Sequence, residues 1–187
     1  MPVDFDKKLL FIHIPKNAGT SVTKAFAMQH EGHYPVSFYK NQMAEDLWQE
    51  YTKFCIVRNP WDRVVSCYEY ARMEKSYYHA VDGPSQYGKH PDYDLLKDAS
   101  FEECIELLKE GKLTHQGWTL QSLWIHDKDV LCVDDKLENL PDKLYEVEIE
   151  ALNKSTRKDY QSYYNEETKQ AVEDLYKVDI ELFDYEF

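Results

Sequence analysis

The stretch LLFIHIPKNAGTSVTKAF, residues 9–26, decides how the chain begins to fold. Its first six residues are apolar except for one histidine, which is typical of a buried strand. The segment PKNAGTS (15–21) follows as a tight loop, and a helix is expected from about residue 20 to about residue 29. Because strand, loop and helix follow one another directly, backbone N–H groups and Lys16 are placed to hold a phosphate-like anion.

This loop differs from a Walker A loop. The pattern GxxxxGK[ST] is absent, and the lysine precedes the glycine instead of following it. A Walker-type enzyme also needs a carboxylate for Mg²⁺, and no such motif is evident. The function of a nucleotide or small-molecule kinase is therefore kept only as an alternative.

Composition narrows the class of protein further. The chain has 187 residues and a formal net charge of −13, which predicts one domain over 1–187 and argues against nucleic-acid binding. No run of 18 apolar residues is present, so we expect no transmembrane segment, and the start of the chain lacks a signal-peptide pattern. Four cysteines at isolated positions predict free thiols, no metal site and a cytoplasmic location.

The order of apolar patterns predicts an α/β fold. Strands are expected at 9–14, 53–57 and 130–133. Helices are expected at about 42–51, 61–73, 100–111, 116–125, from near 137–141, and at 167–177. This alternation predicts a P-loop-like, three-layer α/β/α domain with a mostly parallel central sheet, whose ligands bind beyond the carboxyl ends of the strands. The segment at about 77–99 is irregular, and loops of this length inside a compact domain are usually functional or disordered.

A second candidate anion site lies in FCIVRNPWDRVVSCY, residues 54–68. Arg58 follows a buried strand, where its guanidinium is suited to bind a phosphate through two hydrogen bonds. Ser66 lies about two turns into the next helix and is placed to donate a hydroxyl to the same anion. A salt bridge closing the sheet edge is an equally good explanation of Arg58, and Arg63 with Asp62 is expected to hold the helix to the core.

Together, IPKNAGTSV and IVRNPWDRVVSCYEY resemble the sulfotransferase superfamily, in particular the branch of heparan-sulfate 2-O- and related carbohydrate sulfotransferases with its small bacterial members. The resemblance implies the donor 3′-phosphoadenosine 5′-phosphosulfate and the product 3′,5′-adenosine bisphosphate. The donor's 3′-phosphate is assigned to Arg58 and Ser66. The residues assigned to its 5′-phosphosulfate are Lys16, Asn17, Ala18, Gly19, Thr20 and Ser21.

Two residues are predicted to be catalytic. Lys16 is suited to stabilise the charge that develops on the leaving phosphate, which requires no metal. GHYPVSFY (32–39) resembles the segment that carries the catalytic histidine in this branch, which implies that His33 is the general base. An exposed loop histidine is the other interpretation of His33, and Glu31 or Asp82 is the alternative base.

The end of the chain, residues 152–187, resembles the closing loop and helix of the same family, which places Ser155 and Arg157 near the nucleotide. The sequence DDKLE (134–138) replaces a Gly-Arg-Phe-Glu-like turn of many relatives, so a non-catalytic member of the fold is a further alternative. The acceptor is expected to be a carbohydrate or another hydroxyl-bearing small molecule. Because the protein is acidic, a neutral or weakly charged acceptor is favoured over a sulfated polyanion.

Overall fold

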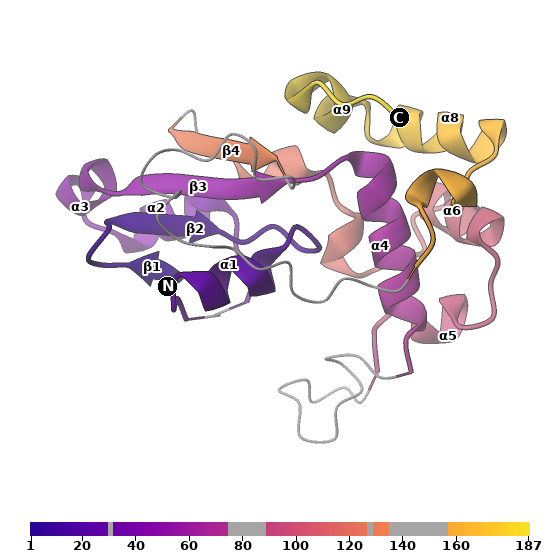
Figure 1. Cartoon of the computed structure of the whole chain (residues 1–187), viewed down its shortest axis with the longest axis horizontal. Helices are drawn as coiled ribbons and strands as arrows, with labels where there is room; N and C mark the ends of the chain where they lie inside the picture. Colours follow the sequence, from indigo (N-terminus) through magenta and orange to yellow (C-terminus); the bar gives the residue numbers. More distant parts are fainter. Residues whose placement is uncertain (30–31, 75–88, 127–128, 135–156) are drawn as a thin grey trace. The chain divides into compact units, whose positions relative to one another are not determined.

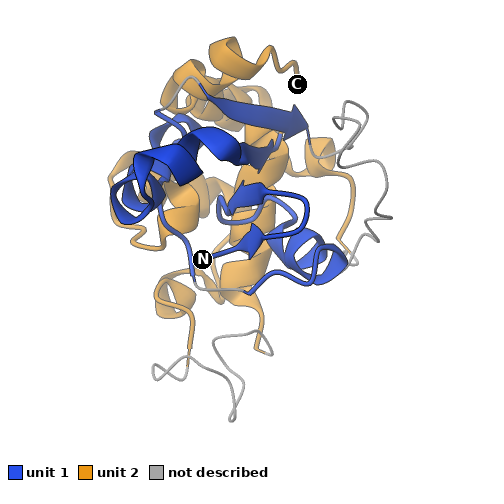
Figure 2. Cartoon of the chain, turned by 90° about the vertical axis from the view of Figure 1, so that its left-hand side faces the viewer, with its two compact units in different colours: residues 1–58, 120–155 blue, residues 59–119, 156–187 orange. Residues whose placement is uncertain are grey.

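The computed structural model describes residues 1–29, 32–74, 89–126, 129–134 and 157–187 (Figure 1). The chain divides into two compact units, one of residues 1–58 and 120–155 and the other of residues 59–119 and 156–187 (Figure 2). The predicted helix near 137–141, Ser155 and much of the segment 77–99 lie outside the described residues. No helix among the described residues is long and apolar enough to cross a membrane.

The first unit contains a four-stranded sheet in the order β1-β2-β3-β4 (Figure 1). The strands are β1 (Val3–Asp4), β2 (Leu9–Ile12), β3 (Thr52–Val57) and β4 (Val130–Asp134). Strand β1 is antiparallel to β2, whereas β2, β3 and β4 are parallel. This confirms the predicted α/β class with a mostly parallel sheet. The two-residue strand β1 was not predicted, because it is too short to show a pattern.

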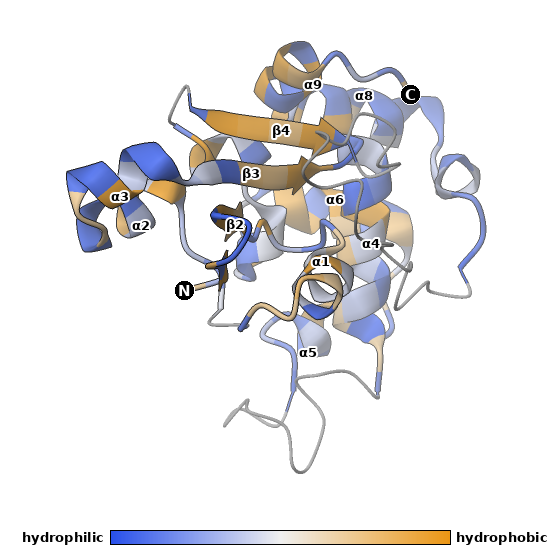
Figure 3. Ribbon diagram, turned by 60° about the vertical axis from the view of Figure 1, so that its left-hand side comes forward, coloured by the Kyte–Doolittle hydropathy of each residue, from blue (hydrophilic) through white to orange (hydrophobic). Residues whose placement is uncertain are grey.

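The core of the first unit lies between helix α1 (Gly19–Ala25) and one face of the sheet. Side chains on a strand alternate between its two faces, so every second residue of β2 and β3 reaches this core. Figure 3 shows the mostly hydrophobic character of β3 and β4. The buried members of the core are Leu9, Phe11, Val22, Phe26, Met28, Phe54, Ile56 and Val133.

Helix boundaries in the first unit differ from the predicted ones. Helix α1 ends at Ala25 instead of near residue 29, and Ala27 adopts a left-handed conformation at φ 49°. The helix predicted at 42–51 is present as the shorter α3 (Glu45–Glu50), and an additional helix, α2 (Val36–Gln42), precedes it. The extended backbone of Met43 and Ala44 separates them. Helix α2 was not predicted.

The second unit is helical. Its first helix α4 (Pro60–Arg72) begins as predicted, with Pro60 in the first turn and the Asn59 side chain capping the N–H of Trp61. In the helix predicted at 100–111, Ser100 forms a capping box at the start of α6 (Phe101–Lys109). The other elements are α5 (Tyr93–Leu96), η1 (Gln116–Trp118), η3 (Tyr160–Tyr163), α8 (Glu166–Leu175) and α9 (Lys177–Phe183).

The single helix predicted at 116–125 is wrong. It is replaced by two short 3₁₀ helices, η1 in the second unit and η2 (Gln121–Trp124) in the first. Thr119 and Leu120, the residues between them, have extended ψ angles of 158° and 140°. The boundary between the two units therefore falls inside the predicted helix.

Candidate functional site

The lysine loop, residues 15–21, leaves the carboxyl end of β2 in a strained conformation. Lys16 and Ala18 both have left-handed backbones, at φ 69° and 53°. Each costs about 1–2 kcal/mol for a residue with a side chain, and such strain concentrates at functional sites. Specific contacts must therefore hold the loop in this shape.

The Asn17 side chain supplies two of these contacts. It is fully buried, and its Nδ2 donates to the Ile56 carbonyl at 2.8 Å and to Gln121 Oε1 at 2.5 Å. These bonds tie the loop to strand β3. The amide group of Asn17 therefore has a structural task, while its Oδ1 has no hydrogen-bond partner among the described residues.

Donors for an anion are nevertheless present in the lysine loop. The backbone N–H groups of Ala18, Gly19 and Thr20 have no acceptor among the described residues, whereas the next two N–H groups bond to the Ala18 carbonyl. Three consecutive donors in the loop that carries Lys16 form a favourable place for a phosphate or sulfonate group.

Arg58 stands at the end of the neighbouring strand β3 and reaches this loop. Its guanidinium NH1 donates to the Lys16 carbonyl at 3.1 Å. Strands β2 and β3 are adjacent and parallel, so their carboxyl ends lie at the same edge of the sheet. The first unit thus brings together the two predicted anion-binding positions, Lys16 and Arg58.

Gln121 fixes the relation between these two positions. It is fully buried at the start of η2, and its Oε1 accepts from the Arg58 N–H at 2.9 Å and from Asn17 Nδ2. Its Nε2 donates to the Arg58 carbonyl at 2.8 Å. Sequence reasoning assigned no role to Gln121. The available signal was a glutamine within the otherwise largely apolar segment WTLQSLW (118–124).

A pair of histidines lies beside the same loop. His33 Nδ1 lies 3.0 Å from the carbonyl oxygen of His13, the first residue after β2. Because a carbonyl only accepts, Nδ1 carries the proton, which leaves Nε2 of the neutral ring as a base. The two ring centroids are 4.1 Å apart, and the Trp124 ring lies edge-on to His33 at 6.3 Å.

The His13 ring explains the glycine of the lysine loop. His13 is 5% exposed, and a Cβ atom at Gly19 would lie 1.6 Å from its Nε2. No side chain fits at position 19 without displacing this ring. Gly19 is therefore required for the close approach of α1 to the histidine pair.

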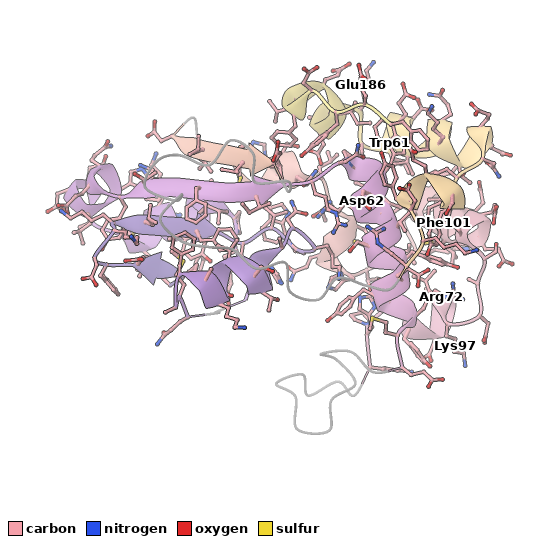
Figure 4. All side chains as sticks on the ribbon, viewed as in Figure 1. Trp61, Asp62, Arg72, Lys97, Phe101 and Glu186 are labelled. Carbon is pink, nitrogen blue, oxygen red and sulfur yellow. The ribbon has the colours of Figure 1, made fainter. Side chains whose placement is uncertain are left out.

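The other predicted site residues belong to the second unit or are not described. Ser66 is half-buried on α4. Asp62, which is labelled on the same helix in Figure 4, forms an ion pair with Arg157. Arg157 and Lys158 line a hollow of about 340 Å³ together with Ser162 and Tyr163. The nucleotide-binding roles of Ser66, Ser155 and Arg157 stay predictions.

Arg63 and Asp62 both anchor the start of α4. Arg63 is buried and holds the helix by donating to the Thr119 carbonyl at 2.8 Å. The Asp62 carboxylate pairs with Arg157. Arg157 also donates to the Asp62 carbonyl at 3.4 Å.

The comparison with known families covers the whole of this site in the first unit. A sequence model described as "Sulfotransferase family" matches residues 1–135, which include the lysine loop, His33, Arg58 and Gln121. The chain belongs to the sulfotransferase family. No curated protein and no solved structure matches it.

The match confirms the resemblance of the two motifs to the sulfotransferase superfamily, while the carbohydrate branch stays a prediction. The match ends before the segment 152–187, so it does not extend to Arg157. In the described ranges, no group of three or more His, Cys, Asp or Glu side chains is arranged to hold a metal ion.

Proposed function

We propose that this sulfotransferase moves the sulfonate of 3′-phosphoadenosine 5′-phosphosulfate to a hydroxyl group, most naturally that of a carbohydrate. One observation carries the proposal. The hydrogen bond between Arg58 NH1 and the Lys16 carbonyl holds two cationic residues at the carboxyl ends of adjacent strands. A donor with one anionic group at its 5′ end and another at its 3′ position matches two neighbouring cationic positions.

The residues of the first unit fit such a donor. The unpaired N–H groups of Ala18, Gly19 and Thr20, with Lys16, are assigned to the 5′-phosphosulfate. Arg58 is assigned to the 3′-phosphate, with Ser66, Ser155 and Arg157 as further predicted contacts. Gln121 acts as a positioning residue, because it bonds both the backbone of Arg58 and the side chain of Asn17.

The transfer step follows from these positions. A bond forms between the acceptor oxygen and sulfur, and the bond between sulfur and the bridging phosphate oxygen breaks. Negative charge develops on the departing phosphate, and Lys16 stabilises it. The acceptor proton passes to His33 Nε2, because the bond from Nδ1 to the His13 carbonyl leaves Nε2 as the basic atom. The alternative bases, Glu31 and Asp82, lie outside the described residues.

The acceptor is proposed from charge. The chain carries a formal net charge of −13, and the site uses Lys16 and Arg58 for the donor. A polysulfated acceptor would be repelled, so a neutral or weakly charged glycan or small alcohol suits the protein better.

A transfer assay tests the proposal. The protein is incubated with the sulfonate donor and a panel of neutral glycans and alcohols, and mass spectrometry detects acceptors that have gained one sulfonate. We expect transfer by the natural chain and by Lys24→Ala, which removes an exposed lysine of α1, but not by Lys16→Ala. Phosphate transfer from ATP, or equal activity of the two lysine variants, would contradict the proposal.

A further inference from the structure

Two cysteines face each other across neighbouring strands of the sheet. Cys55 of β3 and Cys132 of β4 are partners in the strand register, and their sulfur atoms are 3.6 Å apart. Adjacent strands lie about 4.8 Å apart, which falls within the Cα separation of about 4.4–6.8 Å that a disulfide tolerates. The backbone therefore already has the spacing that a disulfide requires.

The two thiols differ in access and in hydrogen bonding. Cys55 is fully buried, whereas Cys132 is half-buried on β4, the last strand of the described sheet. The Cys55 thiol donates a hydrogen bond to the Cys132 sulfur. This bond lowers the pKa of Cys132 and raises that of Cys55. Cys132 is thus the thiol that an oxidant reaches and the one that more readily forms a thiolate, the reactive species.

We propose that Cys55 and Cys132 form a reversible disulfide when a hydroperoxide oxidises the protein. The Cys132 thiolate attacks the terminal peroxide oxygen and the O–O bond breaks. The departing alkoxide takes up the proton that Cys132 released and leaves as an alcohol, and Cys132 becomes a sulfenic acid. The Cys55 sulfur then attacks the Cys132 sulfur, and the sulfenic oxygen departs as water with the Cys55 proton. Two thiols are oxidised and one peroxide is reduced. A thiol reductant reverses the reaction by exchange.

The disulfide site adjoins the candidate donor site. Ile56, the residue after Cys55, accepts the hydrogen bond from Asn17 that ties the lysine loop to β3. Forming the disulfide must bring the sulfur atoms from 3.6 Å to about 2.05 Å, so the two side chains turn toward each other and perturb β3 locally beside Ile56. If the proposed donor binding is correct, oxidation is expected to weaken the affinity for 3′,5′-adenosine bisphosphate several-fold. This consequence rests on the proposed function, whereas the disulfide does not.

Peptide mapping of the full natural chain tests the disulfide directly. The protein is treated with hydrogen peroxide, alkylated, digested with trypsin and analysed by mass spectrometry with and without dithiothreitol. The four cysteines fall in separate tryptic peptides, residues 54–58, 64–72, 98–109 and 129–136. We expect peptides 54–58 and 129–136 to be linked, and dithiothreitol to release them. Full alkylation of both, linkage to another cysteine, or sulfinic acid on Cys132 without linkage would overturn the proposal.

A matched pair of variants and a binding measurement complete the test. Cys132→Ser must abolish the link, and Cys104→Ser, which removes a buried thiol of α6, must preserve it. Bisphosphate affinity is then measured for the reduced and the oxidised chain. If the disulfide forms but the bisphosphate affinity does not change, only the proposed coupling to the lysine loop is overturned. A reduced chain that binds no bisphosphate would contradict the proposed function and leave the disulfide in place.

Discussion

Lys16 and Arg58 are both cationic, but they are expected to act at different stages of the reaction. The Lys16 carbonyl accepts from Arg58, which sets the spacing of the two residues, while the Lys16 ammonium is assigned to the leaving phosphate. An interaction that forms only as charge develops affects turnover more than binding. The two lysine-loop functions, holding the donor and activating it, can therefore be separated experimentally.

For Lys16→Ala we expect kcat to fall about 10²–10³-fold, the usual effect of removing one group that stabilises developing charge. The Kd for 3′,5′-adenosine bisphosphate should change far less, because the N–H groups of Ala18, Gly19 and Thr20 remain. Steady-state kinetics and calorimetry on the same preparation measure both quantities. A Kd that rises as much as kcat falls would assign Lys16 to donor binding alone.

His33 is expected to set the pH dependence of transfer. For His33→Ala we predict a loss of about 10²–10⁴ in kcat, the range for a general base, with unchanged bisphosphate affinity. Activity of the natural chain should decline at acidic pH, because a protonated ring cannot accept the acceptor's proton, and the variant should lack this decline. The pH profile of kcat is the measurement, with the exposed His126→Ala as control. If His33→Ala keeps the pH profile of the natural chain, another group is the base.

At the scale of elements, Gln121 connects η2 to the loop after β2 and to the end of β3. Gln121→Ala removes an acceptor from the partly buried Arg58 N–H and leaves the buried Asn17 Nδ2 with the Ile56 carbonyl alone. Each unsatisfied buried group costs about 1–3 kcal/mol, so we expect a clear loss in the free energy of unfolding together with weaker bisphosphate binding. Urea denaturation and calorimetry measure these effects. The exposed Gln116→Ala of η1 is the control and should change neither.

Elements with local signals were predictable from the sequence. Pro60 and Ser100 mark the starts of α4 and α6 because the first turn of a helix needs specific capping groups. The break between α2 and α3 and the split into η1 and η2 depend on tertiary contacts. Gln121, for example, is held by partners 63 and 104 residues away.

In the candidate site too, features with a local sequence signal were predictable and features that depend on tertiary contacts were not. Lys16 and Arg58 were predictable because each lies in a loop that directly follows an apolar strand, and parallel strands place such loops at one edge. The structural role of the Asn17 side chain was not predictable, because its hydrogen-bond partners Ile56 and Gln121 lie far from it in the sequence. The need for glycine at position 19 likewise arises from the His13 ring, which no local pattern reveals.

At the scale of the whole molecule, Asp92 is expected to make the free energy of unfolding depend on pH in the acidic range. It is fully buried, and its carboxylate accepts from Trp118 Nε1, from the His115 N–H and from both the N–H and the hydroxyl of Thr114, at 2.7–3.1 Å. Burial raises the pKa of Asp92, but these hydrogen bonds outweigh it, so the pKa is lowered overall. The folded chain therefore holds the proton less tightly than the unfolded chain does.

The sign of the pH dependence follows from this lowered pKa. The stabilisation from Asp92 is complete above the ordinary aspartate pKa of about 3.9 and is lost as the pH falls below it. Asp92→Asn should lower the unfolding free energy at pH 7 by about 1–3 kcal/mol and reduce its decline in acid. Urea denaturation across pH is the measurement. Exposed Asp94→Asn is the control, and an equal effect of both variants would contradict the assignment.

The central claim is that the first unit binds a doubly phosphorylated adenosine through the lysine loop and Arg58. Isothermal titration calorimetry with 3′,5′-adenosine bisphosphate, without Mg²⁺, tests it most directly. We predict saturable binding by the natural chain and by Lys24→Ala, and at least about tenfold weaker binding by Arg58→Ala, which loses charge-assisted hydrogen bonds worth about 1.5–3 kcal/mol each. Binding of ATP in place of the bisphosphate, or an Arg58→Ala variant with unchanged affinity, would contradict the account.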